Sequence, residues 1–498
     1  MQVYKVIMIF LISLFAFSSN SYAVYLYNIE DEGGSVVSLK TLLDQPTTEE
    51  LVVAKLNIYQ LNSEIKKLEI PINNDLVVST ELINFETTDN QASVWQGRIV
   101  KVNKGGYIDD KFKNTVDSFV TLIRADNRLT GMISIRGKIY TIKPLDEYRV
   151  AIITLDSSKF PDEGEPITIP GLDASPAAPT NGGAQIPFNP NALSEINILF
   201  ITTPEAFRDI GENNYRGFIA MAATSLQQNA DNSNLRIRYR VRDTITNIPE
   251  NGRTQLQLIR AMQTPDNDLG RYTAYARNRE RADMVQLVVI YNGVCGLGNH
   301  LNGSLDSFRH WAFSTVWQRC VENFTHVHEF GHNFGAMHDI NTERNIHFPW
   351  GFGFRDTAVV PGFSTVMTSC AGCSRINMFS SPLLRPNGRP MGTTMEDNQR
   401  VVDQTRHNAA MVFPNDPGNP VDPEYPVDPG YPTGDYDYVF PYRISTYRAG
   451  TRVLQPRNNI IYECRPFPNE GFCRQWSPST PQFEPGFGSN WRDAWIQR

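Results

Sequence analysis

The chain has 498 residues, of which 41% are hydrophobic and 20% are charged, and its formal net charge is −7. This composition is that of an ordinary globular protein, and the length allows roughly two to four domains with cores of their own. The mildly acidic balance argues against a nucleic-acid partner, because nucleic-acid-binding domains are usually basic.

Residues 1–23 are typical of an export signal. Lys5 supplies an early positive charge, residues 6–17 are apolar, and residues 21–23 form a small-x-small cleavage sequence. A membrane anchor is the alternative, but about a dozen apolar residues are few for a span that needs roughly 20. No later segment has the length and apolarity of a membrane span, so we expect a secreted, extracellular protein.

Residues 24–156 alternate apolar and polar side chains in short runs, for example at 118–124 and 138–143, with turn residues between the runs. This period of two is typical of strands, so the segment is expected to be all-β. Residues 157–193 are instead rich in Pro, Gly and Ala, which indicates an exposed connector.

From Ser194 the pattern becomes α/β. Strands that alternate with helices build a sheet with covering helices. Apolar periodicity predicts strands at 196–201, 235–241 and 284–291, and helices at 215–230 and 254–262.

The segment from His328 to His338 contains a pattern of metal ligands. His328 and His332 are four residues apart, so they share one face of a helix and can bind one ion. Gly335 can end that helix in a left-handed conformation, which lets His338 become the third ligand. Three histidines leave a fourth position of Zn²⁺ open for water, and Glu329 is placed to act as general base on it.

A run of surface histidines is the alternative interpretation. The five fixed positions of the pattern would coincide by chance in only on the order of 1 in 10⁵ such chains. The remaining histidines lack comparable spacing; they are His300, His310, His326, His347 and His407.

This pattern resembles the zinc signature of the metzincin metalloproteases, and residues 364–369 resemble their methionine turn, which would place Met367 beneath the metal. Asp339 and residues 378–382 are similar to the reprolysin branch. Residues 396–402 are similar to bacterial reprolysin-like proteases, which include the peptidyl-Asp metallopeptidases.

The resemblance covers residues 194–413 and implies a mixed sheet above a looser lower lobe, with an extended substrate in the cleft between them. Astacin-like members have a Tyr where this chain has Ser369. The resemblance therefore implies that one zinc ion stabilises the oxyanion and Glu329 activates the water. The peptidyl-Asp name suggests Asp at the cleavage site, but neither the specificity pocket nor a structural Ca²⁺ can be identified from the sequence.

Residues 129–140 resemble reprolysin prodomains, which implies a β-rich prodomain over residues 24–156. Many metzincins are silenced by a prodomain cysteine on the zinc, but this chain has no cysteine before Cys295. We expect the active form to begin between Ser157 and Ser194. If the prodomain inhibits the enzyme, a carboxylate or steric blockage must take the place of the cysteine. The candidate carboxylates are Asp162, Glu163 and Glu165. The alternative for each is an acid that is merely solvated in a flexible loop.

Residues 414–438 form a Pro-rich linker, which favours an extended spacer. Residues 439–498 are aromatic-rich and few enough to need a disulfide, so we expect a small β-rich module. They resemble small chitin-binding modules, and flat aromatic faces suit sugar rings. The candidates for binding chitin or GlcNAc-rich glycans, with a core role as the alternative for each, are Tyr462, Trp476, Trp491 and Trp495.

The six cysteines are an even number, and export permits disulfides. Pairing by proximity predicts three disulfides, with a zinc or redox site as the alternative for the second: Cys295–Cys320, Cys370–Cys373 and Cys464–Cys473.

We therefore expect a secreted zinc metalloendopeptidase that hydrolyses internal peptide bonds of extracellular or surface proteins and glycoproteins. One alternative is a glycan-binding adhesin with a vestigial protease domain, against which the intact Glu329 argues. Another is a chitin-processing enzyme, but no paired-carboxylate motif is recognisable.

Overall fold

The computed structural model describes most of the chain. The expected export signal at 1–23, almost all of the linker at 414–438 and Cys370 lie outside the described residues. Within the described part, no helix is long and apolar enough to cross a membrane. The described residues are 24–30, 37–57, 61–88, 91–110, 116–170, 172, 191–291, 293–341, 344–358, 362–369, 373–386, 388–413, 436, 438–441, 444, 447–455, 458, 460–476 and 480–498.

The described residues from 24 to 155 form an 11-stranded sheet and the short helix α1 (Val37–Leu43). The strand order is β1-β4-β5-β6-β8-β9-β10-β11-β3-β2, and β7 pairs with β6. Leu68, Ile70 and Ile72 of β4 are buried and alternate with more exposed residues, as the period of two predicts. The strands are β1 (Val24–Tyr25), β2 (Tyr27–Ile29), β3 (Thr48–Leu56), β4 (Lys67–Asn73), β5 (Leu76–Thr87), β6 (Ser93–Lys104), β7 (Tyr107–Asp109), β8 (Phe119–Ala125), β9 (Arg128–Ile135), β10 (Lys138–Pro144) and β11 (Arg149–Leu155).

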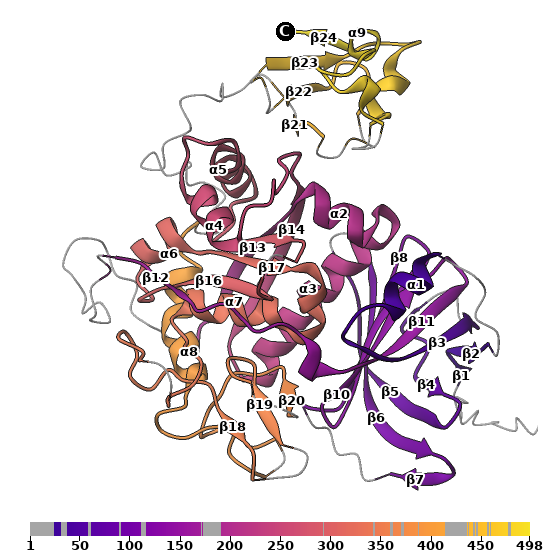
Figure 1. Ribbon diagram of the computed structural model, residues 1–498, viewed down its shortest axis with the longest axis vertical. Helices are drawn as coiled ribbons and strands as arrows, with labels where there is room; N and C mark the ends of the chain where they lie inside the picture. The colour runs from indigo at the N-terminus through magenta and orange to yellow at the C-terminus, as the bar shows by residue number, and fades with distance from the viewer. Residues whose placement is uncertain are drawn as a thin grey trace, which may run out of the picture.

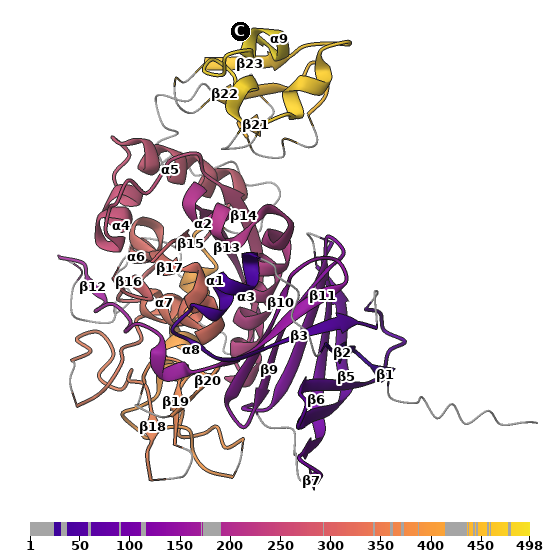
Figure 2. The same ribbon diagram turned by 45° about the vertical axis from the view of Figure 1, so that its right-hand side comes forward.

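One face of this sheet packs on helix α3 (Glu212–Asn232), and both ribbon views show the two side by side (Figures 1 and 2). Val94 and Met132 of the sheet belong to the same buried cluster as Ile219 and Leu226 of α3. The N-terminal sheet therefore shares a core with the α/β part of the chain, which the sequence did not predict.

The second sheet has the strand order β12-β16-β17-β15-β13-β14. Strands β13, β14, β15 and β17 run parallel, and β16 is antiparallel to β17, so the sheet is mixed. Strand β12 pairs with β16 in parallel. The strands are β12 (Ile167–Thr168), β13 (Ser194–Thr202), β14 (Ile237–Ile245), β15 (Met284–Val289), β16 (Gly296–His300) and β17 (Phe313–Trp317).

Helices cover both faces of this sheet, which explains its apolar strands. Ile198 and Phe200 of β13 lie in the cluster that includes α3 and α7, whereas Leu199 and Ile201 lie in the cluster that includes α4 and α5. The predicted helices at 215–230 and 254–262 correspond to α3 and α4. Besides α3, the helices of this part are α2 (Pro204–Ile210), α4 (Gln255–Gln263), α5 (Asp268–Glu280), α6 (Leu305–Trp311), α7 (Thr325–Phe334) and α8 (Asn398–Ala409).

Below α7 in Figure 1 the chain has little regular structure. It contains a three-stranded sheet of β18 (Arg355–Asp356), β19 (Phe363–Thr365) and β20 (Ser374–Ile376). Strands β19 and β20 flank the predicted methionine turn, so this segment positions residues beneath the metal ligands.

The C-terminal segment forms a four-stranded sheet in the order β21-β22-β23-β24, drawn beyond α5 in both ribbon views (Figures 1 and 2). Leu454 of β22 joins the cluster that includes α4 and α5. The elements are β21 (Tyr438–Val439), β22 (Arg452–Gln455), β23 (Ile460–Cys464), η4 (Glu470–Arg474), η5 (Pro481–Phe483), α9 (Trp491–Ala494) and β24 (Trp495–Gln497).

Candidate metal centre

Helix α7 brings the three predicted histidines together. His328 and His332 lie one turn apart on this buried helix, and Gly335 ends it with a φ of 103°. A left-handed residue of this kind reverses the chain at little cost only when it is glycine. The chain then returns His338 to the same point, and the ligand atoms of the three residues lie within 4.8 Å of one another.

The ring nitrogens of these histidines are oriented for a cation. Their Nε2 atoms lie 2.9 to 3.0 Å apart. The Nδ1 atoms of His328 and His332 lie 2.9 Å from the carbonyl oxygens of Val366 and Ala336. Because a carbonyl oxygen requires a donor, both Nδ1 atoms carry the proton, and the Nε2 lone pairs of the two rings converge on one point. This donor set fits Zn²⁺.

Burial keeps the imidazoles of His328 and His332 neutral. It lowers the pKa of His328 and of His332 well below the ordinary value, and the neighbouring histidines lower both further. A neutral imidazole is the form that binds a metal ion, so the protein environment favours the ligand state.

Glu329 lies beside the first ligand and is fully buried. Neither of its carboxylate oxygens has a hydrogen-bond partner in the described structure. Burial raises the pKa of Glu329 well above its usual value, the charge of Glu163 raises it further, and Arg375 lowers it. A buried carboxylate without partners is costly, so its place beside the histidines is consistent with the predicted general base.

Two glycines of strand β16 leave room for this carboxylate. A Cβ atom at Gly296 would lie 2.5 Å from Oε1 of Glu329, and one at Gly298 would lie 3.0 Å from Oε2. Larger residues would force the glutamate to move. The sequence analysis did not identify these glycines, because only the pairing of β16 with its neighbours places them against α7.

Met367 packs directly beneath α7. A Cβ atom at Gly331 would lie 2.3 Å from the sulfur of Met367, and the methionine itself is fully buried. The helix can approach the turn closely because position 331 has no side chain. Met367 therefore lies against the helix that bears His328 and His332.

Arg375 is a buried cation near Glu329 that the sequence did not indicate as a site residue. Arg375 of β20 donates to the carbonyl oxygen of Val366 through Nε at 3.0 Å, and it forms an ion pair with Glu163 of the connector at 2.5 Å. No local motif marks an arginine in an irregular lower lobe as a site residue.

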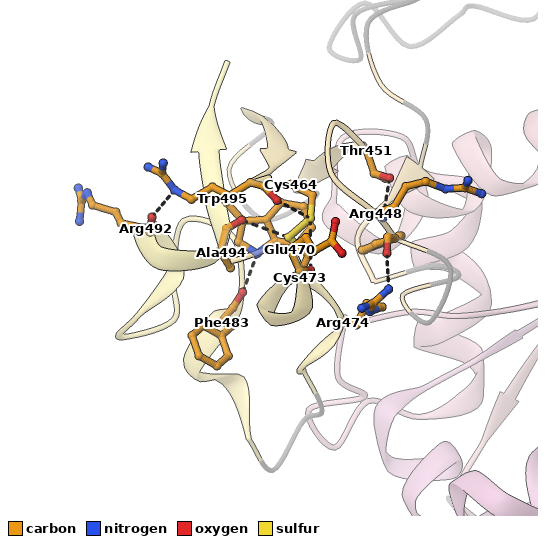
Figure 3. The surroundings of a disulfide bond; sticks show 12 residues. Arg448, Thr451, Cys464, Glu470, Cys473, Arg474, Phe483, Arg492, Ala494 and Trp495 are labelled. Atoms are coloured by element: carbon orange, nitrogen blue, oxygen red, sulfur yellow. Dashed lines mark hydrogen bonds between the residues drawn. A yellow bond between two sulfur atoms is a disulfide. The ribbon is translucent and has the colours of Figure 1, made fainter. Parts of the chain in front are cut away.

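The four aromatic candidates of the C-terminal segment have different environments. Trp495 and Tyr462 are buried in its core, and the Trp495 indole donates to the Phe483 carbonyl at 2.8 Å (Figure 3). Trp476 and Trp491 are only partly buried and pack on the edge of the same core. Burial favours a packing role for Trp495 and Tyr462. Among these four residues, only Trp476 and Trp491 keep part of the side chain accessible to a ligand.

Two of the three predicted cysteine pairings are present. Cys295 is bonded to Cys320, and Cys464 to Cys473. The second bond lies against the Trp495 ring in the core of the C-terminal segment (Figure 3). The third predicted pairing involves Cys370 and is therefore outside the described residues.

Residues 218–339, which include the three histidines, match the reprolysin-like family M12B of metallo-peptidases. The chain is 27% identical over 388 residues to a peptidyl-Asp metalloendopeptidase of Xanthomonas campestris pv. campestris, a match that covers 75% of this chain and 88% of that protein. It is 27% identical over 339 residues to a peptidyl-Asp metalloendopeptidase of Stenotrophomonas maltophilia, covering 65% and 78% of the two chains.

A shorter segment has a different relative. Over 64 residues the chain is 58% identical to the GlcNAc-binding protein A of Photobacterium profundum, and this match covers 13% of each protein. The likeness is thus close but confined to a small part of both chains. The chain is accordingly a zinc metalloendopeptidase, with one segment that matches the reprolysin-like M12B family and another that is similar to GlcNAc-binding protein A.

Proposed function

We propose that this chain is a secreted endopeptidase that hydrolyses internal peptide bonds of extracellular proteins and glycoproteins. In this proposal His328, His332 and His338 hold one zinc ion, which when bound polarises a water molecule and the substrate carbonyl. Glu329 takes the proton of that water as general base. The observation that carries the proposal is the unpartnered, buried carboxylate of Glu329 beside three converging imidazole nitrogens.

The remaining parts of the chain are assigned roles in the same proposal. Residues 1–23 direct export, residues 24–156 act as a prodomain, and the connector at 157–193 is cut to release the enzyme. The catalytic domain is residues 194–413. The pairing of β12 with β16 supports an inhibitory connector, because β16 packs against the helix that bears the metal ligands.

The C-terminal segment is proposed to hold the enzyme on its targets. We assign the likeness to GlcNAc-binding protein A to residues 439–498, joined to the enzyme by the linker at 414–438. Chitin or GlcNAc-rich glycans are the proposed ligands. Trp476 and Trp491 are the favoured contacts, since aromatic faces that are partly exposed can stack on sugar rings.

Incubation of the processed enzyme with casein and, separately, with chitin tests this function. We expect cleavage of casein, loss of that activity with the chelator phenanthroline, and its recovery on addition of Zn²⁺. Chitin should retain the protein but release no sugar. Retention on chitin without any proteolysis would instead support the adhesin, and release of sugar would support a chitin-processing enzyme.

A further inference from the structure

The connector runs along strand β16, beside the metal centre. The Cys295 amide donates to the Asp162 carbonyl and the Gly164 amide donates to the Gly296 carbonyl, both at 2.9 Å. Three residues after Gly164, the connector continues as β12, which pairs in parallel with β16. A Cβ atom at Gly164 would lie 2.8 Å from the Gly296 oxygen, so the two backbones approach closely.

Within this stretch only one of three acids is directed inward. The side chain of Glu163 is 14% exposed, whereas Asp162 and Glu165 are exposed to solvent. Oε1 of Glu163 accepts from the Thr325 hydroxyl at 3.0 Å, at the first residue of α7. The carboxylate therefore lies at the N-terminus of the helix that bears the metal ligands, where the helix dipole favours a negative charge.

The principal partner of Glu163 is Arg375, whose side chain is only 7% exposed. The other hydrogen bonds of this guanidinium go to the carbonyl oxygens of Asn323 and Val366, and its Nη2 lies 2.7 Å from Nδ1 of His328. Carbonyl oxygens carry no full charge, so Glu163 is the anion that is hydrogen-bonded to this buried cation. Removing one partner of a buried ion pair is strongly unfavourable.

We propose that Arg375 and Thr325 form the subsite that receives an acidic side chain of the substrate, and that Glu163 occupies this subsite until the connector leaves. The inference rests on the proposed function, because it assigns specificity-determining residues and an internal occupant to the same centre. Departure of the connector leaves a buried guanidinium and a helix N-terminus beside Glu329, and a substrate carboxylate restores the lost charge pair. A planar guanidinium suits a carboxylate better than it suits an amide.

The connector occupies this subsite without contacting the metal ligands through Glu163. Glu163 contacts Arg375 rather than the histidines, and the group of converging ligand atoms consists of the three histidines within the described chain. Glu163 thus blocks the centre by pairing with the subsite residue Arg375, and it does not itself supply a metal ligand.

The test uses the full zinc-loaded chain and two fluorogenic peptides of neutral sequence that differ only in one residue, Asp or Asn. Glu163→Gln should raise cleavage of the Asp peptide at least about tenfold over the unchanged chain, because the internal occupant has lost its charge. Asp162→Asn and Glu165→Gln are matched controls, and their rates should stay within about twofold of the unchanged chain, since exposed acids contribute little.

The double variant Glu163→Gln/Arg375→Gln tests the subsite itself without leaving an unpaired buried charge. Its preference for the Asp peptide over the Asn peptide, measured as the ratio of the two kcat/KM values, should fall from at least about tenfold to about one. Thermal unfolding should show that this variant is folded. A free peptide of residues 160–169 should inhibit Glu163→Gln, and the same peptide with Gln at position 163 should inhibit about tenfold more weakly.

The possible results separate the two proposals. A Glu163→Gln chain that holds zinc and cleaves neither peptide contradicts the proposed endopeptidase. Cleavage with an Asp preference that survives in the double variant leaves the endopeptidase intact and overturns the role of Arg375. Equal inhibition by the two free peptides overturns the role of Glu163.

Discussion

Replacing Gly296 by Ala should remove most of the activity and leave the metal in place. The new Cβ atom would lie 2.5 Å from Oε1 and 2.8 Å from Cγ of Glu329, and 2.6 Å from Cγ2 of Thr325. Ordinary contacts between such atoms are roughly 3.5 Å or longer. Since Thr325 and Glu329 both belong to the buried helix α7, the side chain of Glu329 is the part that can move.

The displacement needed to relieve these contacts is about 1 Å, and a misplacement of that size can cost about 100-fold in rate, equivalent to about 2.7 kcal/mol of transition-state stabilisation. The metal ligands should be unaffected, because the closest atoms at position 296 belong to Glu329 and Thr325 and not to a histidine. We therefore expect a large fall in kcat/KM at an unchanged zinc content.

The assay is hydrolysis of a fluorogenic peptide by the processed enzyme, with zinc measured on the same sample. Gly471→Ala is the matched control, since a Cβ atom there meets no atom within 4 Å. Full activity of Gly296→Ala would refute the argument that Glu329 has no room to spare. Loss of zinc would show that the strand supports the ligands and not the base.

Trp495→Ala should destabilise the C-terminal segment by about 3–5 kcal/mol, because it removes a buried aromatic ring. Trp491→Ala should instead leave the segment folded and reduce its retention on chitin. Circular dichroism and a chitin pull-down distinguish the two outcomes. Burial raises the pKa of Asp283 to about 7, although the amides of Asn197 and Phe413 donate to it. A raised pKa means that the folded state holds the proton more tightly, so this group should favour folding below about pH 4 and lose that contribution as the pH rises to about 7. Denaturant unfolding at several pH values should show that the free energy of unfolding of the unchanged chain falls between about pH 4 and 7 relative to that of Asp283→Asn. The same pH dependence in both proteins would contradict the raised pKa of Asp283. Replacing both Cys464 and Cys473 by Ser should unfold the C-terminal segment, because a disulfide that closes a short loop contributes about 3 kcal/mol of stability. Hydrolysis of a small peptide should persist, because the metal ligands lie outside that segment.

The features predicted best are those encoded in short stretches of sequence. The sequence spacing of His328 and His332 predicts that they share one face of a helix, as they do in α7. Gly335 has the left-handed conformation that returns His338 to the same point. The alternating and helical periods likewise identify β10, β13 and α3, since burial on one face is a local property of each element.

The features that were missed depend on contacts between distant segments. Nothing near Arg375 indicates that it meets Glu163, which is 212 residues away in sequence. The shared core between the N-terminal sheet and α3 is also invisible to periodicity, because an apolar strand face does not specify its partner. For the same reason the sequence could not separate the buried Trp495 from the partly exposed Trp491.

The most direct test of the central claim is the substitution Glu329→Gln, which keeps the size of the side chain and removes its ability to take a proton. The processed variant should bind one zinc ion as the unchanged enzyme does, because position 329 is not among the converging ligand atoms. Its kcat should fall by about 10²–10⁴-fold or more, the usual contribution of a general base. Retention of near-normal turnover with zinc bound would contradict the account, since another group would then activate the water.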